Sequence, residues 1–317
     1  MDILAFSLNA TMPVVLCMAL GLFSRRVGLI DKEIAPRLGN YCFSVFIPAL
    51  IFYSIYSIDF SAEFSLRLVL FTGISITCLI IVLCLIFFST LKDKAKAAAY
   101  VHLSHRSNYA MYGVALTQGM FGSAGLRVAA MLIPVAIILF NLAAVLLLSY
   151  GSANKDSSPG QMAREFLLNL LKNPLIITIV VALTISLSPL VMPAFLYATV
   201  QNISGVAVPL SLIVVGSQIK LSGLKKDVKD VAVISCMRLI VVPLIMLPIA
   251  VHMGFRGPAL AALFAIFASP CANAGAIMSQ KYNIYPDLAN QTLATTTVFS
   301  GLTNFVGISI LRYLQFF

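Results

Sequence analysis

Long apolar runs separated by short polar segments dominate the chain. An α-helix needs about 20 apolar residues to cross a hydrocarbon core of about 30 Å, whereas a barrel strand needs only about 10. Lipid offers no partner to unpaired backbone groups, so runs of this length predict transmembrane helices. We expect an all-α membrane protein with ten of them, at residues 4–23, 39–57, 68–90, 105–122, 128–150, 173–190, 195–217, 231–251, 258–280 and 289–314.

The charged residues fix the orientation of these runs. Of the 317 residues, 60% are hydrophobic and only 10% are charged, against roughly 25% charged in soluble domains. Sixteen of the 21 Lys and Arg residues follow the odd-numbered runs, and only four lie on the opposite side. The positive-inside rule therefore predicts a multi-pass protein of the cell membrane with both termini outside the cytoplasm. This topology accounts for the net charge of +10 without a nucleic acid partner.

The two halves of the chain carry related positions. Four pairs keep nearly the same separation, of 161 to 163 residues: Pro13 with Pro174, Pro48 with Pro209, Gly113 with Gly275, and Asn141 with Asn304. With five helices in each half, the second repeat must lie inverted in the membrane. We therefore expect one repeat at 1–150, a cytoplasmic connection at 151–172 and an inverted repeat at 173–317. Inverted repeats are typical of secondary transporters, whose substrate site lies near the midplane where the repeats meet.

The fourth and ninth runs hold the candidate substrate site. Gly, Pro and polar residues interrupt both, and freed backbone groups at membrane depth need protein or a water-filled cavity beside them. The expected substrate-binding residues are Asn108, Tyr109, Gly113, Gln118, Pro270, Asn273, Gly275 and Gln280, with Asn141 and Asn304 from the runs that follow. Close helix packing is the alternative explanation for the two glycines, and aromatic packing for Tyr109.

The ionisable residues restrict the chemistry. All 11 Asp and Glu residues fall in loops or at the ends of runs, which suits an anionic substrate and leaves no buried carboxylate to carry protons. Coupling to Na⁺ through neutral oxygens and plain uniport both remain open. Arg238 lies inside the eighth run, where it is either a functional residue, a structural pairing or a side chain that snorkels to the cytoplasmic interface.

Two histidines precede the fourth run. His102 and His105 are expected at the cytoplasmic mouth, and without a third ligand we predict no metal site there. A membrane-embedded enzyme would need buried acids, a Ser/His pair or a metal motif, so we expect no enzymatic activity and no cofactor.

The motifs Pro270-x11-Tyr282-Asn283-x-x-Pro286-Asp287 and Asn108-x4-Gly113 resemble those of the auxin efflux carrier family, and the length and short central loop resemble its bacterial members. The resemblance implies the fold shared with bile acid–sodium symporters, with crossing fourth and ninth helices that move in an elevator-like or rocking manner. It also implies a small organic anion as substrate, such as indole acetate or a malonate-type carboxylate, Asn108 facing that substrate, and a homodimer. The positions that match the family's crossover prolines hold Ala115 and Gly275, so the interruptions are expected at those residues.

The sequence thus predicts a secondary transporter that moves a small organic anion by alternating access. The alternatives are a sodium-coupled organic-anion symporter and a membrane-embedded sensor, channel or enzyme.

Overall fold

The computed structural model describes residues 3–31, 33–56, 65–152, 160, 164, 167–168, 171–188, 190–219 and 227–317. In this part of the chain the regular structure is helical. The first half contains α1 (Ile3–Arg26), α2 (Ile34–Tyr41), η1 (Cys42–Phe46), α3 (Ile47–Tyr56), α5 (Leu66–Thr90), α6 (Lys94–His105), η2 (Tyr109–Gly113) and α7 (Val114–Gly151). The second half contains α9 (Pro174–Ser186), α10 (Ala194–Ser217), α11 (Val228–Cys236), η3 (Met237–Val241), α12 (Val242–His252), α13 (Gly257–Ala268), α14 (Asn273–Lys281) and α15 (Pro286–Tyr313). Most of the connection expected at 151–172 lies outside the described residues.

Polar residues start several of these helices. The Ser65 hydroxyl accepts a hydrogen bond from the Leu68 N–H, and the Asn173 side chain accepts one from the Leu175 N–H. The Asp93 carboxylate accepts from the N–H groups of Ala95 and Lys96 at the start of α6. Such caps satisfy backbone donors that have no partner inside the first turn of a helix.

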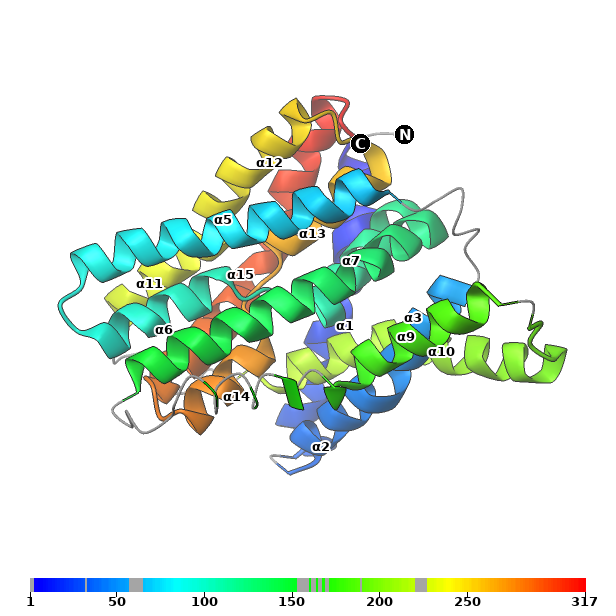
Figure 1. The fold of residues 1–317 in the computed structure, drawn as a ribbon, viewed down its shortest axis with the longest axis horizontal. Coiled ribbons are helices and arrows are strands. Elements are labelled where there is room, and N and C mark those ends of the chain that lie inside the picture. The colour runs from blue at the N-terminus through cyan, green and yellow to red at the C-terminus, as the bar shows by residue number, and fades with distance from the viewer. Residues whose placement is uncertain are drawn as a thin grey trace.

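The helices form two groups that we call the panel and the bundle. The panel consists of α1, α2, η1, α3, α9 and α10, and the bundle consists of α5, α6, η2, α7 and α11–α15 with η3 (Figure 1). Within the panel, helix α1 lies at the boundary with the bundle, because it packs on α10 of the panel and also on α7 and α15 of the bundle. The surface of both groups carries large apolar side chains such as Leu16, Leu85 and Leu244, as expected of helices that face lipid.

Seven helical segments among the described residues are long and apolar enough to cross a membrane by length and composition. Helices α9 and α13 are shorter apolar helices. Residues 109–151 count as one segment, yet Gly122 interrupts their helix with φ 58° and ψ −137°, a conformation that only glycine adopts readily. This break separates two of the expected runs, at 105–122 and 128–150.

Two expectations about the interrupted helices were wrong. The fourth run does not begin at residue 105, because Lys94–His105 is already helical as α6. The interruptions do not fall at Ala115 and Gly275, which lie inside α7 and α14. The helical path instead breaks between α6 and η2 and between α13 and α14, so Pro270 lies in the second break. Two lysines and two histidines make α6 resemble a loop in sequence.

Candidate substrate site at the crossing of two broken helices

The two helix breaks meet and bond to each other. Ser107 and Cys271 form an isolated antiparallel bridge. The Asn108 N–H donates to the Pro270 carbonyl at 2.9 Å, and the Ala272 N–H donates to the Arg106 carbonyl at 3.1 Å. These bonds replace helical partners that the breaks remove, which membrane-depth backbone requires. The α6–η2 and α13–α14 paths therefore cross at their breaks.

A cavity of about 630 Å³ lies beside this crossing, within the usual size range of small-molecule sites. The panel lines it with residues of α1, α2, η1 and the ends of α9 and α10, and the bundle lines it with residues of the two breaks and of α7, α14 and α15. Five of the expected site residues line the cavity: Asn108, Tyr109, Asn141, Asn273 and Gln280.

The other five expected residues lie in the packing around it. A Cβ atom at Gly113 would lie 2.6 Å from the Tyr109 ring, and one at Gly275 would lie 3.3 Å from Arg106 Cδ, so both glycines allow close packing. Pro270 accepts the backbone bond at the break. Asn304 is fully buried and donates to the Tyr112 hydroxyl at 2.9 Å, whereas Gln118 is half-buried on α7.

Arg106 is the principal residue that the sequence analysis missed. It lies in the first break, is only 6% exposed and lines the cavity. Its guanidinium donates to the Phe140 carbonyl at 3.0 Å and to Asn141 Oδ1 at 2.8 Å, while its Nε has no partner. The neighbouring Asn108 is 5% exposed, and its Nδ2 also lacks a partner. A helix predicted at 94–105 would have placed Arg106 directly after its buried end rather than in a loop.

Other polar side chains come from the panel. Arg25 of α1 lines the cavity, and its Nη1 donates to the Ser217 carbonyl at 2.7 Å. Gln218, which follows α10, accepts a hydrogen bond at Oε1 from Asn273 Nδ2. This amide pair joins the first residue of α14 in the bundle to the end of α10 in the panel. It therefore spans the boundary between the two groups at the cavity.

The two histidines do not lie at a surface. His102 and His105 are both fully buried, because α6 extends into the bundle. His102 Nε2 donates to the Gly275 carbonyl at 3.2 Å and His105 Nδ1 to the Val101 carbonyl at 2.7 Å. Both rings are thus buried in the bundle, contrary to the expectation that the two histidines lie at the cytoplasmic mouth. Among the described residues no third His, Cys, Asp or Glu groups with them.

Arg238 does not snorkel to the interface. It is fully buried, and its guanidinium donates to three backbone carbonyls near the two breaks. Of the alternatives that the sequence left open for Arg238, this geometry fits a structural pairing.

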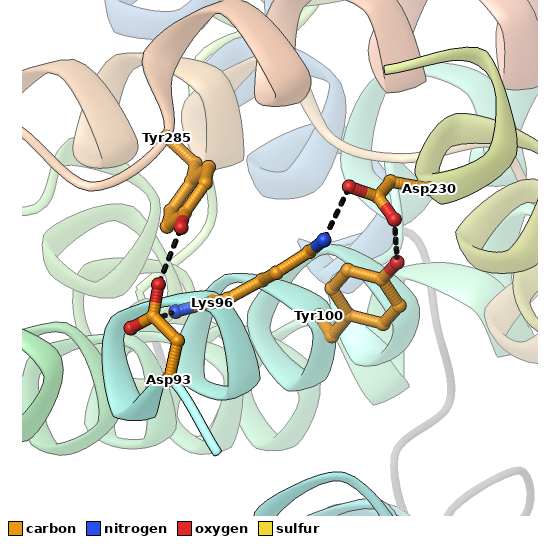
Figure 2. Close-up of polar contacts among 5 residues, drawn as sticks. All are labelled: Asp93, Lys96, Tyr100, Asp230 and Tyr285. Atoms are coloured by element: carbon orange, nitrogen blue, oxygen red, sulfur yellow. Dashed lines mark hydrogen bonds and ion pairs between the residues drawn. The ribbon is translucent and has the colours of Figure 1, made fainter. Parts of the chain in front are cut away.

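A polar network fastens the start of α6 to the second half of the chain (Figure 2). Lys96 lies 2.7 Å from an Asp230 carboxylate oxygen, and the Tyr100 hydroxyl donates to the same carboxylate at 2.5 Å. The Tyr285 hydroxyl donates to Asp93. This bond lowers the pKa of Asp93 and raises the pKa of Tyr285 to about 12, because it stabilises the carboxylate and the neutral phenol.

The segment Tyr282–Tyr285 forms the tight turn between α14 and α15. Asn283 and Tyr285 have positive φ angles of 52° and 43°. The side chain of Ile284, the residue between these two, is buried. Asn is among the residues that tolerate this region best. Most of the motif that begins at Pro270 therefore shapes a turn. The residues in this part of the chain that line the cavity are sequence neighbours of the motif.

These features define a helical membrane protein of many spans with a cavity at the crossing of two broken helices, lined by amide and arginine side chains among mostly apolar surface. The chain matches the family model described as "Membrane transport protein" over residues 6–308, and it belongs to that family, the auxin efflux carriers. It is 27% identical over 308 residues to an uncharacterized transporter of Methanothermobacter thermautotrophicus, covering 93% of this chain and 95% of the relative. The protein is thus a multi-pass membrane protein of a transporter family, and this family is not an enzyme family.

Proposed function

We propose that this protein is a secondary transporter that binds a small organic anion, a carboxylate, in the cavity at the helix crossing and moves it by alternating access. The observation that carries the proposal is a pair of unpartnered buried donors, Arg106 Nε and Asn108 Nδ2, beside a cavity that no Asp or Glu of the described residues lines. A buried donor without a partner is costly, and an anionic ligand removes that cost.

The charge around the cavity supports an anion. Arg106 bonds only to a carbonyl and an amide, so no carboxylate among the described residues offsets its charge. Helix α14 begins beside the cavity at Asn273, and helix N-termini carry positive partial charge and free N–H groups. Arg106 presents a planar set of donors that matches a carboxylate.

The two groups of helices provide the moving parts. The cavity lies between panel and bundle, so a displacement of one against the other changes its access. Alternating access in transporters with broken helices is largely a rigid-body movement of this kind around a site near the midplane. The Asn273–Gln218 bond spans the boundary and must break when the bundle moves along the panel.

An inverted repeat supports the same mechanism. At the crossing, Ser107 pairs with Cys271 in an antiparallel bridge, and the two residues are 164 apart in the chain. This separation is close to the sequence offsets of 161 to 163, so the two breaks pair at nearly corresponding positions of the expected repeats. We infer ten spanning helices in two inverted repeats, with the cavity opening toward the basic, cytoplasmic side.

Cysteine labelling tests this topology. In a cysteine-free background, Ser152→Cys is expected to react with a membrane-impermeant maleimide only after permeabilisation, whereas Ser188→Cys reacts in intact cells. The reason is that Ser152 follows the fifth expected run and Ser188 lies near the end of the sixth. Labelling of both positions from the same side would contradict the inverted arrangement.

Replacing the amides tests the site. Asn108→Leu or Asn273→Leu is expected to lower uptake of labelled carboxylates into proteoliposomes by about tenfold or more, because each change removes polar donors at the crossing. Asn202→Leu makes the same exchange on the exposed face of α10 and is expected to transport like the unaltered protein. Thermal unfolding in detergent checks that all three variants fold.

Unchanged kinetics in folded Asn108→Leu and Asn273→Leu would place the site elsewhere. The transport proposal itself fails if the unaltered protein moves and binds none of a set of mono- and dicarboxylates under any imposed Na⁺, H⁺ or voltage gradient.

A further inference from the structure

Arg238 occupies an unusual position in the bundle. It lies in η3, a single π-helical turn between α11 and α12, and its side chain is the largest fully buried one among the described residues. Such turns insert an extra residue into a helix and occur frequently at functional sites. Burying a guanidinium without partners would cost several kcal/mol, so its environment must compensate for its charge.

That compensation comes from the two broken helices. Nε of Arg238 donates to the Ser269 carbonyl at 2.8 Å, and Nη2 donates to the Ile266 carbonyl at 2.6 Å. Nη1 donates to the His105 carbonyl at 3.2 Å. Ile266 lies in the last turn of α13, Ser269 follows it, and His105 ends α6. One cation therefore serves the carbonyl ends of both broken helices.

Carbonyl groups of this kind form cation sites in other carriers. A helix C-terminus carries about half a negative charge, since its last carbonyls have no helical partner. In transporters with broken helices, these ends and the unwound carbonyls beside them coordinate the coupling Na⁺ or H⁺. Here the guanidinium already binds carbonyls of both ends, and no ion pair with Arg238 occurs among the described residues.

We propose that Arg238 is a resident cation that takes the place of a co-transported one, so that the carrier moves its anion without coupled Na⁺. The inference rests on the proposed function. It gives the two buried arginines different roles: the helix ends offset the charge of Arg238, which positions the crossing, while the charge of Arg106 remains for the substrate.

The unaltered protein provides the first test. Carboxylate uptake into proteoliposomes is measured with Na⁺, K⁺ or N-methylglucamine as the bulk cation at matched membrane voltage. We expect rates that agree within about twofold among the three cations, because the cation place at the helix ends is filled. A rise of about tenfold or more with a Na⁺ gradient would overturn the inference.

Arg238→Ala provides the second test, because it leaves the three carbonyls without their cation. Uptake is expected to fall by about tenfold or more. Guanidinium chloride, at millimolar concentrations below those that denature proteins, is expected to restore part of the rate and to raise the unfolding temperature of the variant. Urea has a similar shape without the charge and is expected to do neither.

Arg256→Ala is the matched control. Arg256 also donates to backbone carbonyls, of Val251 and Phe255, but lies in an exposed turn. Its removal is expected to leave uptake unchanged and to create no response to guanidinium.

The outcomes separate this inference from the transport proposal. If a folded Arg238→Ala variant transports at the full rate, or gains neither uptake nor stability from guanidinium, Arg238 is not a resident cation even though transport stands. If no carboxylate moves at all, the transport proposal fails. The unfolding temperature of Arg238→Ala with and without guanidinium then still shows whether Arg238 is a resident cation. If this variant does not fold, the cation series on the unaltered protein decides alone.

Discussion

Arg106→Gln is expected to weaken carboxylate binding by about a hundredfold, measured as the equilibrium affinity of purified protein for a labelled carboxylate. Truncating one partner of a buried, hydrogen-bonded charge pair costs about 2–5 kcal/mol, and about 2.7 kcal/mol corresponds to a hundredfold change. Arg106 is 6% exposed and no carboxylate of the described residues faces it, so a bound anion would be its main counter-charge.

Competition in the same binding experiment tests whether the ligand must be an anion. Benzoate is expected to compete with the labelled carboxylate in the unaltered protein, whereas benzamide, which has nearly the same shape without the charge, is expected to compete weakly. Arg106→Lys keeps the charge but loses the planar edge of the guanidinium, so we expect an affinity between those of the other two proteins.

Arg25→Gln is the matched control for charge, because Arg25 lines the same cavity from the panel side and is more exposed. The loss of the Arg25 charge is expected to lower the affinity for the carboxylate by only about threefold. Salt should screen this effect, because the Arg25 side chain is partly exposed to solvent. Equal losses in Arg25→Gln and Arg106→Gln would show a general effect of charge and would contradict direct binding by Arg106.

Gly216→Ala is expected to lower the free energy of unfolding by about 3 kcal/mol or to prevent folding. A Cβ atom at Gly216 would lie 2.0 Å from the Met18 carbonyl oxygen, and one at Gly21 would lie 2.0 Å from the Ile213 carbonyl oxygen. Helices α1 and α10 therefore touch backbone to backbone, as small residues allow in membrane proteins. Neither backbone can yield without separating these two helices of the panel.

Gly205→Ala is the control, because Gly205 lies on the same helix and a Cβ there would meet nothing within 4 Å. Alanine favours helix over glycine by about 1 kcal/mol, so this variant should be as stable as the original or slightly more so. Both variants are compared by thermal unfolding in detergent. Equal stability of the two would mean that α1 and α10 do not pack this closely.

Much of the helical architecture was predictable from the apolar runs. The expected runs 4–23, 68–90 and 195–217 correspond closely to α1, α5 and α10, since apolar residues predominate along these helices and no Asp, Glu, Lys or Arg falls inside the runs. The fourth run was misplaced because α6 buries Lys-flanked Ala, Ser and His residues inside protein, where hydropathy is a poor guide. Only neighbouring helices make such a segment stable in a membrane.

The candidate site was predictable by residue type but not by geometry. The interrupted runs and the run that follows the first of them pointed to four amides and one tyrosine that line the cavity: Asn108, Tyr109, Asn141, Asn273 and Gln280. The glycines and Asn304 belong to the packing, because no sequence pattern distinguishes a small residue at a helix contact from one at a ligand. Arg106 was not predicted as a site residue, because a charged residue at the end of an apolar run is usually interpreted as part of a loop.

The sequence by itself determined that the chain is a helical membrane protein, because lipid permits few backbone structures to cross it. It did not determine where the helices break or what their ends bind. Those depend on contacts between residues far apart in the chain, such as Arg238 with Ser269 and His105, and Ser107 with Cys271. Only the tertiary structure brings the two breaks together and places one buried arginine on the helix ends and another at the cavity.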